Sequence, residues 1–302
     1  MNSTGYSIKD LEVLSGIKAH TIRIWEKRYN LLNPRRTKTN IRSYNDDDLR
    51  RMLNVSLLVR YGHKISKVAK WSDDAVNKAV VEITAGKTSV SDQMDLLILH
   101  MVNFDAKKFE RLVDEVIAEK GIEEATTSLF FDFFVKVGLY WQTGSVFPAQ
   151  EHYVSHVFRQ KLIAATEKLH VNDDGALGLF FLPGHEQHEL SLLFYNYVAI
   201  KNGCRTLYLG QSVPRDDLVK LEKHVHPDFI FTAFTNSVSR DDLEEYLTFL
   251  NELFYNRQIF ITGLQVREHP LEMPGDITVI MNYKDFRQSI KKQEYLEKED
   301  IV

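Results

Sequence analysis

The stretch His20–Tyr44, HTIRIWEKRYNLLNPRRTKTNIRSY, decides how the first part of this chain is interpreted. Its basic side chains lie on a short helical segment and on the polar loop that follows: Arg23, Lys27, Arg28, Arg35, Arg36, Lys38 and Arg42. Residues 1–70 hold 15 Lys and Arg against 6 Asp and Glu, a net charge of +9, whereas the remainder holds 23 basic and 36 acidic residues, a net of −13. A basic head on an acidic body is typical of a polyanion-binding domain, so nucleic acid is the first partner to consider.

The composition of the 302-residue chain fits several globular domains and excludes some classes of protein. With 44% hydrophobic and 26% charged residues, the chain can build ordinary cores, and broad disorder is not expected. Cys204 is the only cysteine, which excludes an intrachain disulfide and a cysteine-rich zinc site. No apolar run approaches the ~20 residues that span a bilayer, and the first residues lack the apolar segment of a signal peptide. We therefore expect a cytoplasmic protein without a membrane partner.

The first 72 or so residues carry the signals of successive helices. Ser7 is placed to cap a first helix, which Gly16 ends, and a second helix is expected from about Ala19 to Arg28. The apolar positions of the first helix share one face: Ile8, Leu11 and Leu14. Pro34 and the polar run to Ser43 predict a loop, and Asn45 with its three following aspartates predicts the cap of another helix.

Two helices joined by a tight turn predict a helix-turn-helix. The second helix would present Arg23, Lys27 and Arg28 to a major groove while the basic loop contacts phosphates. Its anchoring residues are expected behind it: Ile22, Trp25 and Tyr29. The concentration of positive charge argues against the alternative, a solvated basic helix without a ligand.

The rest of the chain divides into a helical segment and a segment of alternating strands and helices. Residues 73–170 lack strand signals and predict four or five helices. After a linker at Val171–Gly175, five short apolar runs are each followed by a helical stretch or a turn: 177–182, 205–210, 228–234, 258–263 and 277–281. Five such units in sequence predict a parallel sheet covered by helices.

A parallel sheet of this kind binds ligands beyond the carboxyl ends of its strands. The loop after the first strand, Pro183–Glu189, reads PGHEQHE. A histidine beside a carboxylate at such a place can be a metal ligand whose other nitrogen is oriented by the acid, and a solvated loop histidine is the alternative. His152 and His156 lie four apart on a predicted helix and could chelate zinc, but no third ligand is evident, so a cap role or burial is preferred.

The first segment resembles a known family. The residues YSIKDLEVLSGIKAHTIRIWEKRYNLL, the following RR and RSYNDDDL resemble the winged-helix DNA-binding domain of MerR-type transcription regulators, across residues 1–75. The resemblance implies a recognition helix and a wing that contacts the DNA backbone and minor groove. The residues that the resemblance implicates are His20, Thr21, Arg23 and Arg28 at the helix and Arg35, Arg36, Arg42 and Tyr44 in the wing. We add Lys27, which the second helix would also present to the groove. The resemblance also implies binding as at least a homodimer to an inverted repeat in a double-stranded DNA operator or promoter. The cysteines of the metal-sensing branch are absent here.

A second resemblance covers the remaining residues. They are similar to the cobalamin-binding module of light- or B12-responsive MerR-type regulators, with a helical-bundle cap at 88–170 and a Rossmann-like five-stranded parallel α/β domain at 174–302. Trp141, Glu151 and His152 match the cap signature, and Glu186 and His188 match the loop motif. The resemblance implies that His188 replaces the cofactor's own base on cobalt and that the displaced tail slides between sheet and helices. The cap residues would cover the upper face of adenosylcobalamin or methylcobalamin.

The departures from the family pattern fall at the cofactor. Ser191 stands where the loop motif has glycine, and Thr262-Gly263 retains half of a Gly-Gly pair that lets the tail pass. The polar end of the third strand matches approximately, at Thr232, Thr235, Asn236 and Ser237. Gln142 replaces a histidine that light-responsive members use as a second cobalt ligand, so a light response of that kind is not expected.

We therefore expect a winged helix-turn-helix transcription regulator whose cobalamin-binding module sets its oligomeric state. An alternative keeps the DNA-binding role and makes the module a cofactor-free domain for oligomerisation, another ligand or a protein partner. A corrinoid-dependent methyltransferase or mutase subunit is a third possibility, but such an enzyme needs no basic winged helix, so no enzymatic activity is expected.

Overall fold

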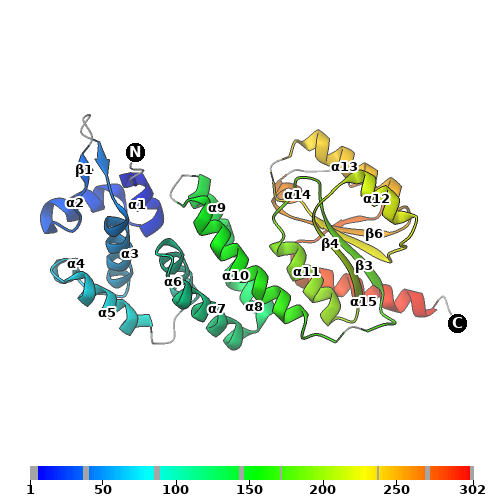
Figure 1. Ribbon diagram of the computed structural model, residues 1–302, viewed down its shortest axis with the longest axis horizontal. Helices are drawn as coiled ribbons and strands as arrows, with labels where there is room; N and C mark the ends of the chain where they lie inside the picture. The colour runs from blue at the N-terminus through cyan, green and yellow to red at the C-terminus, as the bar shows by residue number, and fades with distance from the viewer. Residues whose placement is uncertain are drawn as a thin grey trace. The chain divides into compact units, whose positions relative to one another are not determined.

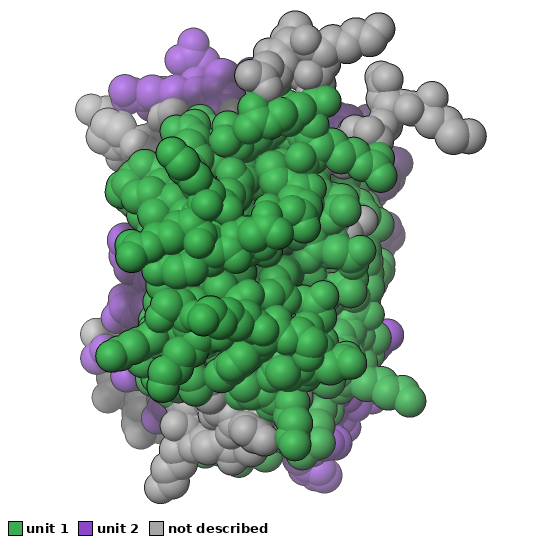
Figure 2. All heavy atoms as spheres, turned by 90° about the vertical axis from the view of Figure 1, so that its left-hand side faces the viewer, with its two compact units in different colours: residues 1–157 green, residues 158–302 purple. Residues whose placement is uncertain are grey.

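The computed structural model describes residues 6–36, 41–84, 89–142, 146–170, 172–236, 238–268 and 273–299. The chain forms two compact units, residues 1–157 and residues 158–302, which Figure 2 colours separately. The first unit contains the predicted head together with most of the predicted helical cap. The division into three domains remains a prediction.

The head begins with the two helices that the sequence predicts, α1 (Ile8–Ser15) and α2 (Ala19–Tyr29). The Ser7 hydroxyl accepts a hydrogen bond from the Asp10 backbone N–H at 3.2 Å, and the Asp10 carboxylate accepts one from the Ser7 N–H at 2.7 Å, which closes a capping box. Gly16 ends α1 with φ of 72°, a left-handed conformation that glycine adopts without strain. Ile22 and Trp25 are buried as expected.

The residues after α2 form a short hairpin where the residue pattern predicted only a loop. Strand β1 (Arg35–Arg36) pairs antiparallel with β2 (Arg42–Ser43), with Arg35 opposite Ser43 (Figure 1). Strands of two residues carry no apolar alternation, so the sequence pattern could not reveal them. Lys38 lies outside the described residues.

Helix α3 (Asp46–Arg60) forms the centre of the head and packs on α1 and on two following helices, α4 (Ile65–Val68) and α5 (Asp73–Thr84). Asn45 and Asp48 form a second capping box at its start, which confirms the cap that the sequence predicted. Leu49 and Met52 are fully buried on its inner face.

Every described element from residue 90 to residue 166 is helical, as predicted. The elements are α6 (Val90–Val102), α7 (Ala106–Lys120), α8 (Ile122–Ala125), the π-helical turn η1 (Thr126–Phe130), α9 (Phe131–Gln142) and α10 (Pro148–Thr166). Their packing in the first unit centres on rings such as Phe109 and Phe133, whose centroids lie 5.9 Å apart. Helix α10 starts in the first unit and ends in the second.

The second unit is a five-stranded parallel sheet in the order β4-β3-β5-β6-β7, which confirms the predicted α/β domain (Figure 1). Its strands are β3 (Leu177–Pro183), β4 (Arg205–Val213), β5 (Phe229–Ala233), β6 (Gln258–Thr262) and β7 (Ile277–Val279). Its helices are α11 (Leu190–Lys201), α12 (Arg215–Glu222), α13 (Arg240–Leu253), α14 (Leu264–Glu268) and α15 (Tyr283–Glu299). The chain reverses its direction across the sheet between β3 and β5, so their carboxyl ends mark the switch point where such sheets bind ligands.

Residue alternation along the strands assigns the two faces of this sheet. Phe180, Phe231 and Phe260 face the side covered by α11 and α15. Ile230 and Ile259 face the other side, where Leu218 of α12 and Leu243 of α13 pack on them. None of the helices in the described parts of the chain combines the length and apolarity that crossing a membrane requires.

Candidate functional site

The predicted recognition residues of α2 lie close together on its solvent-exposed side. His20, Arg23, Lys27 and Arg28 are all exposed. The first three recur at spacings of three and four residues, which share one side of a helix, and Arg28 is next to Lys27. Thr21 is partly buried, and its Oγ1 lies 3.3 Å from His20 Nε2. This surface suits a polyanion because its cations face solvent rather than buried acids.

Ile24 was not singled out in the sequence and lies within this basic face. Its side chain is 51% exposed, next to Arg23 and one turn from Lys27 and Arg28. The alternation of Ile22 and Ile24 around Arg23 could have indicated it, since a helix cannot bury both positions on one face.

The wing is tied to α2 through Glu26. The Tyr44 hydroxyl donates to Glu26 Oε1 at 2.6 Å, and Arg42 Nε donates to Oε2 at 3.0 Å. Arg35 and Arg36 of β1 are exposed on the same hairpin. The carboxylate therefore holds the second wing strand against the recognition helix, a role that a lone acid within a basic segment could have suggested.

Tyr44 directly follows β2, in the wing, where the resemblance implied. Its side chain is fully buried, and its backbone N–H and C=O pair with the C=O and N–H of Tyr6 at 2.9 and 2.8 Å. Desolvation by burial and the Glu26 carboxylate raise the pKa of Tyr44 well above its usual range. Tyr44 therefore supports the wing from beneath, and its ring is not at the surface where DNA would be contacted.

One further arginine of the head has a structural role. Arg51 Nε donates to the Leu31 carbonyl at 3.2 Å, its Nη2 donates to the Trp71 carbonyl at 3.0 Å, and Nη1 contacts Asp73. The head's net charge therefore overstates the number of cations that face a ligand.

The predicted cap residues lie at the surface of the first unit. Trp141 at the end of α9 is 55% exposed. On α10, His152 Nδ1 lies 3.1 Å from Glu151 Oε2, and the Ser155 hydroxyl donates to Glu151 Oε1 at 2.6 Å. His156 is exposed, and the described residues contain no group of three or more His, Cys, Asp or Glu side chains that could hold a metal ion. The side chain of Gln142 lies outside the described residues.

The helix that carries Trp141 has an unexpected apolar surface. Val135 and Leu139 are exposed on α9, one turn apart, while Phe130 and Phe133 are buried in the core. Aromatic content alone could not separate these two faces of the segment.

The loop after β3 is organised around the carboxylate of Glu186. Its Oε2 accepts hydrogen bonds from the backbone N–H groups of Thr235 and Asn236, each at 2.7 Å, and its Oε1 accepts one from the His188 N–H at 2.9 Å. Burial alone would raise the pKa of Glu186, but the His188 side chain and these backbone donors lower it to about 2. The buried carboxylate therefore stays ionised and joins the loops that follow β3 and β5.

The same carboxylate orients the His188 ring. His188 Nδ1 lies 2.8 Å from Glu186 Oε1, and the side chain is 56% exposed. A proton on Nδ1 that is donated to the carboxylate leaves the lone pair on Nε2, which is the arrangement of a metal-ligating histidine. The structure thus brings Glu186 and His188 together as the sequence predicted, at the switch point of the sheet.

Two further contacts shape this loop. Asn236 Nδ2 donates to the His185 carbonyl at 2.9 Å, and His185 has a φ of 72°. Below the loop, the Tyr208 hydroxyl donates to the buried Glu189 carboxylate at 2.9 Å, and Arg159 Nε lies 3.0 Å from the other oxygen of that carboxylate.

The remaining predicted cofactor residues are divided between the two faces of the sheet and the loops at its carboxyl edge. Ser191 is partly buried at the start of α11, and its Oγ has no hydrogen-bond partner among the described residues. Thr232 is fully buried on the face shared with Ile230, so its side chain lies on the opposite side of the sheet from α11. Thr235 follows β5 and contributes its backbone N–H to Glu186. Ser237 lies outside the described residues.

Thr262 ends β6 and Gly263 follows it, close to the end of β5. The Thr262 hydroxyl is buried and donates to the Ile280 carbonyl at 2.9 Å. A Cβ at Gly263, whose φ is 113°, would lie 2.2 Å from the Phe234 carbonyl oxygen. The glycine is therefore required by the approach of the chain's own backbone.

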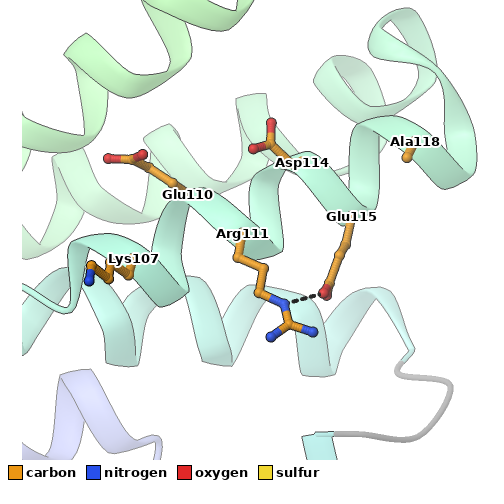
Figure 3. Close-up of a pocket in the computed structure, with 6 residues that line it drawn as sticks. All are labelled: Lys107, Glu110, Arg111, Asp114, Glu115 and Ala118. Atoms are coloured by element: carbon orange, nitrogen blue, oxygen red, sulfur yellow. Dashed lines mark hydrogen bonds and ion pairs between the residues drawn. The ribbon is translucent and has the colours of Figure 1, made fainter.

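A shallow hollow on α7 carries no comparable chemistry. Figure 3 shows its lining, in which Arg111 Nε donates to Glu115 Oε1 at 2.8 Å. The other lining residues are Lys107, Glu110, Asp114 and Ala118. Because one helix supplies every described lining residue, the hollow lacks the opposed walls of a binding pocket.

Comparison with known proteins identifies the family. The model of the MerR HTH family regulatory proteins matches residues 6–74, and the model of a B12 binding domain matches residues 94–165, from α6 into α10. The HTH-type transcriptional repressor CarH of Myxococcus xanthus is 30% identical over 278 residues, which cover 87% of this chain and 90% of the repressor. The chain belongs to the MerR family of transcription regulators, in the branch with a B12-binding domain.

A second relative of this MerR-family regulator is the HTH-type transcriptional repressor CarA of Myxococcus xanthus, 21% identical over 264 residues that cover 87% of this chain and 88% of CarA. Both relatives are transcriptional repressors and not enzymes, which agrees with the expectation from the basic head. The structure of the Methanosarcina barkeri monomethylamine corrinoid protein superposes with a TM-score of 0.52 at 17% identity, covering 67% of the regulator and 98% of that chain. That likeness concerns the fold.

The residues of the regulator fit one part of a cobalamin and not another. At the loop, the carboxylate-oriented imidazole of His188 suits an axial ligand to cobalt. Behind the loop, Tyr195 of α11 stacks on Phe231 at 4.5 Å and meets Phe286 of α15 edge-on at 5.3 Å, and all three side chains are buried. These rings fill the space between helices and sheet, where the nucleotide tail was expected.

Proposed function

We propose that the regulator binds double-stranded DNA as at least a homodimer, with α2 in the major groove and the wing along the backbone. The exposed row of His20, Arg23, Lys27 and Arg28 on α2 carries this proposal. A palindromic operator would match the two-fold symmetry of such a dimer.

An operator selected from random DNA tests this assignment. The change Arg23→Ala or Arg28→Ala should weaken binding by about 1–3 kcal/mol if the side chain reads a base, or should reduce the salt dependence by about one ion if it contacts a phosphate. Lys78→Ala removes an exposed cation of α5 and serves as the matched control. Unchanged affinity and salt dependence in both arginine variants would defeat the assignment.

We further propose that the second unit senses a corrinoid through His188. When bound, the corrinoid supplies a cobalt ion that can accept the Nε2 lone pair. The observation that carries this proposal is the 2.8 Å contact of His188 Nδ1 with Glu186, whose other oxygen is held by two backbone N–H groups. Trp141, Glu151 and His152 are proposed to cover the upper face, which would carry an adenosyl or methyl group, and occupancy is proposed to set the oligomeric state.

Gel filtration in the dark, with visible spectra, tests the corrinoid proposal. A corrinoid should co-elute with an imidazole-ligated spectrum and change the elution volume. His188→Ala should abolish the spectrum, whereas His224→Ala, which removes an exposed histidine of the same unit, should not. Binding that survives His188→Ala would refute the assignment of the ligand.

The packing of Tyr195 on Phe231 favours a second candidate function. In it the second unit takes no cofactor and serves oligomerisation, another ligand or a protein partner. The same experiment separates the two, because this candidate requires that no corrinoid co-elutes with the protein.

A further inference from the structure

The sheet face beneath α11 and α15 is packed with aromatic rings. Phe180 of β3 stacks on Phe231 of β5 at 5.4 Å and 20°. Tyr195 of α11 stacks on the same Phe231 at 4.5 Å and 28°, and Phe286 of α15 lies edge-on to Phe231 at 5.1 Å. All four side chains are at most 3% exposed, so the helix–sheet layer is filled by the protein itself.

The filling reaches the carboxyl end of the sheet. Thr262, the last residue of β6, is buried on the same face of the sheet as Phe260, and its hydroxyl donates to the Ile280 carbonyl at 2.9 Å. Ser191, four residues before Tyr195, places a buried hydroxyl in the first turn of α11. The rings and these two hydroxyl side chains thus close the layer beside the loop that carries His188.

The opposite face at the same edge is also packed. Thr232 and Ile261 are fully buried there, and the Phe234 ring meets Tyr246 of α13 at 5.8 Å. A substituent that entered the domain from the His188 loop would therefore meet buried side chains on either side of β5.

The chemistry of a cobalamin makes this packing decisive. Its nucleotide tail leaves the corrin ring on the face that the tail's own base occupies, and His188 would approach cobalt on that face. A tail displaced by His188 must then lie between the ring and the edge of the sheet. Protein interiors are close-packed, so a heteroaromatic base cannot enter a layer that stacked rings already fill without expelling one of them.

We propose that the His188 site takes a corrinoid that lacks the nucleotide tail, with Tyr195 and Phe231 occupying the space that a tail would need. This inference rests on the proposed corrinoid function of the second unit. The site is expected to exclude the nucleotide tail and to accept the corrin ring, whose cobalt would be bound by His188.

A comparison of two probes with the full-length protein tests the inference. Diaquacobinamide has no nucleotide tail, and hydroxocobalamin carries one. Titration in the dark, followed by visible spectra, should show His188-dependent coordination of cobinamide with an affinity at least tenfold higher than that of hydroxocobalamin. His188→Ala should abolish the cobinamide spectrum, and His224→Ala should leave it unchanged.

A variant of the packed layer separates exclusion of the tail from the intrinsic difficulty of displacing a cobalamin's own base. Tyr195→Ala should raise hydroxocobalamin affinity at least tenfold and leave cobinamide affinity within twofold. Tyr197→Ala removes another buried tyrosine of α11 and should change neither affinity. Tyr195→Leu is the milder variant if Tyr195→Ala does not fold, as judged by circular dichroism.

The outcomes distinguish the two levels of the argument. Hydroxocobalamin that binds wild-type protein as tightly as cobinamide, in a base-off form that His188→Ala abolishes, would overturn the inference and uphold the proposed function. Failure of both probes to bind would overturn the proposed corrinoid function and the inference with it. A tenfold preference that Tyr195→Ala does not reduce would also overturn the role given to Tyr195.

Discussion

The contact between Tyr44 and Glu26 offers a measurable link between the wing and the recognition helix. We consider the change Glu26→Ala, the change Tyr44→Phe and the double variant. The Tyr44 hydroxyl is buried and donates at 2.6 Å to a carboxylate whose side chain is 9% exposed. Because 18 residues separate the two, loss of the contact should free β2 from α2.

The magnitude follows from the burial of each group. A hydrogen bond to a charged acceptor contributes about 1.5–3 kcal/mol, and a buried donor left unpaired costs about 1–3 kcal/mol. The Arg42 side chain is 30% exposed, so its ion pair with Glu26 contributes about 0–1 kcal/mol. Glu26→Ala should therefore lower the free energy of unfolding of the first unit by about 2–4 kcal/mol. The coupling energy in the cycle should be about 1.5–3 kcal/mol.

Urea denaturation of the full chain, followed by tryptophan fluorescence, measures these differences, and binding to a selected operator measures the effect on function. Tyr29→Phe is the control because Tyr29 is partly buried on the same helix and has no role in holding the wing in this scheme. Operator affinity should fall in Glu26→Ala and Tyr44→Phe and stay unchanged in Tyr29→Phe. A coupling energy below about 0.5 kcal/mol would refute the reasoning, since independent sites add to within that amount.

Three further predictions concern other residues. The pKa of Glu186 is lowered from 4.5 to about 2, so this carboxylate contributes about 3 kcal/mol to the free energy of unfolding above pH 4.5. That contribution is lost as the pH falls through about 2. The urea stability of Glu186→Gln should therefore approach that of wild type over this window. Burial lowers the pKa of His100 from 6.5 to about 4, so the contribution of this histidine to the free energy of unfolding is present above pH 6.5 and is lost as the pH falls towards 4. His100→Gln should therefore flatten the acid side of the plot of stability against pH for the first unit. An unchanged plot would contradict this. Ile24→Ala should reduce discrimination at one A·T pair by about 1–3 kcal/mol without changing the salt dependence, as measured by competition between operator variants, because an apolar side chain can contact a thymine methyl group.

Local interactions explain why much of this protein could be predicted from its residues. Ser7 and Asn45 cap helices through side chains that bond backbone N–H groups three residues away, and Gly16 ends α1 through its own φ. The apolar runs from 177 to 281 become strands because each is short, buried and followed by a turn or helix. These signals depend on near neighbours, so the linear sequence contains them in full.

The sequence by itself therefore determined a basic helix-turn-helix, an all-helical segment, a five-stranded parallel domain and a histidine–carboxylate loop. Tertiary structure decided what lies against these elements. Glu186 meets its backbone donor at Thr235 across 49 residues, and the Tyr44 hydroxyl donates to Glu26 across 18 residues. The stacking of Tyr195 on Phe231 joins a helix to a strand. Such contacts join residues far apart in sequence through packing of the whole unit, and no local pattern encodes them.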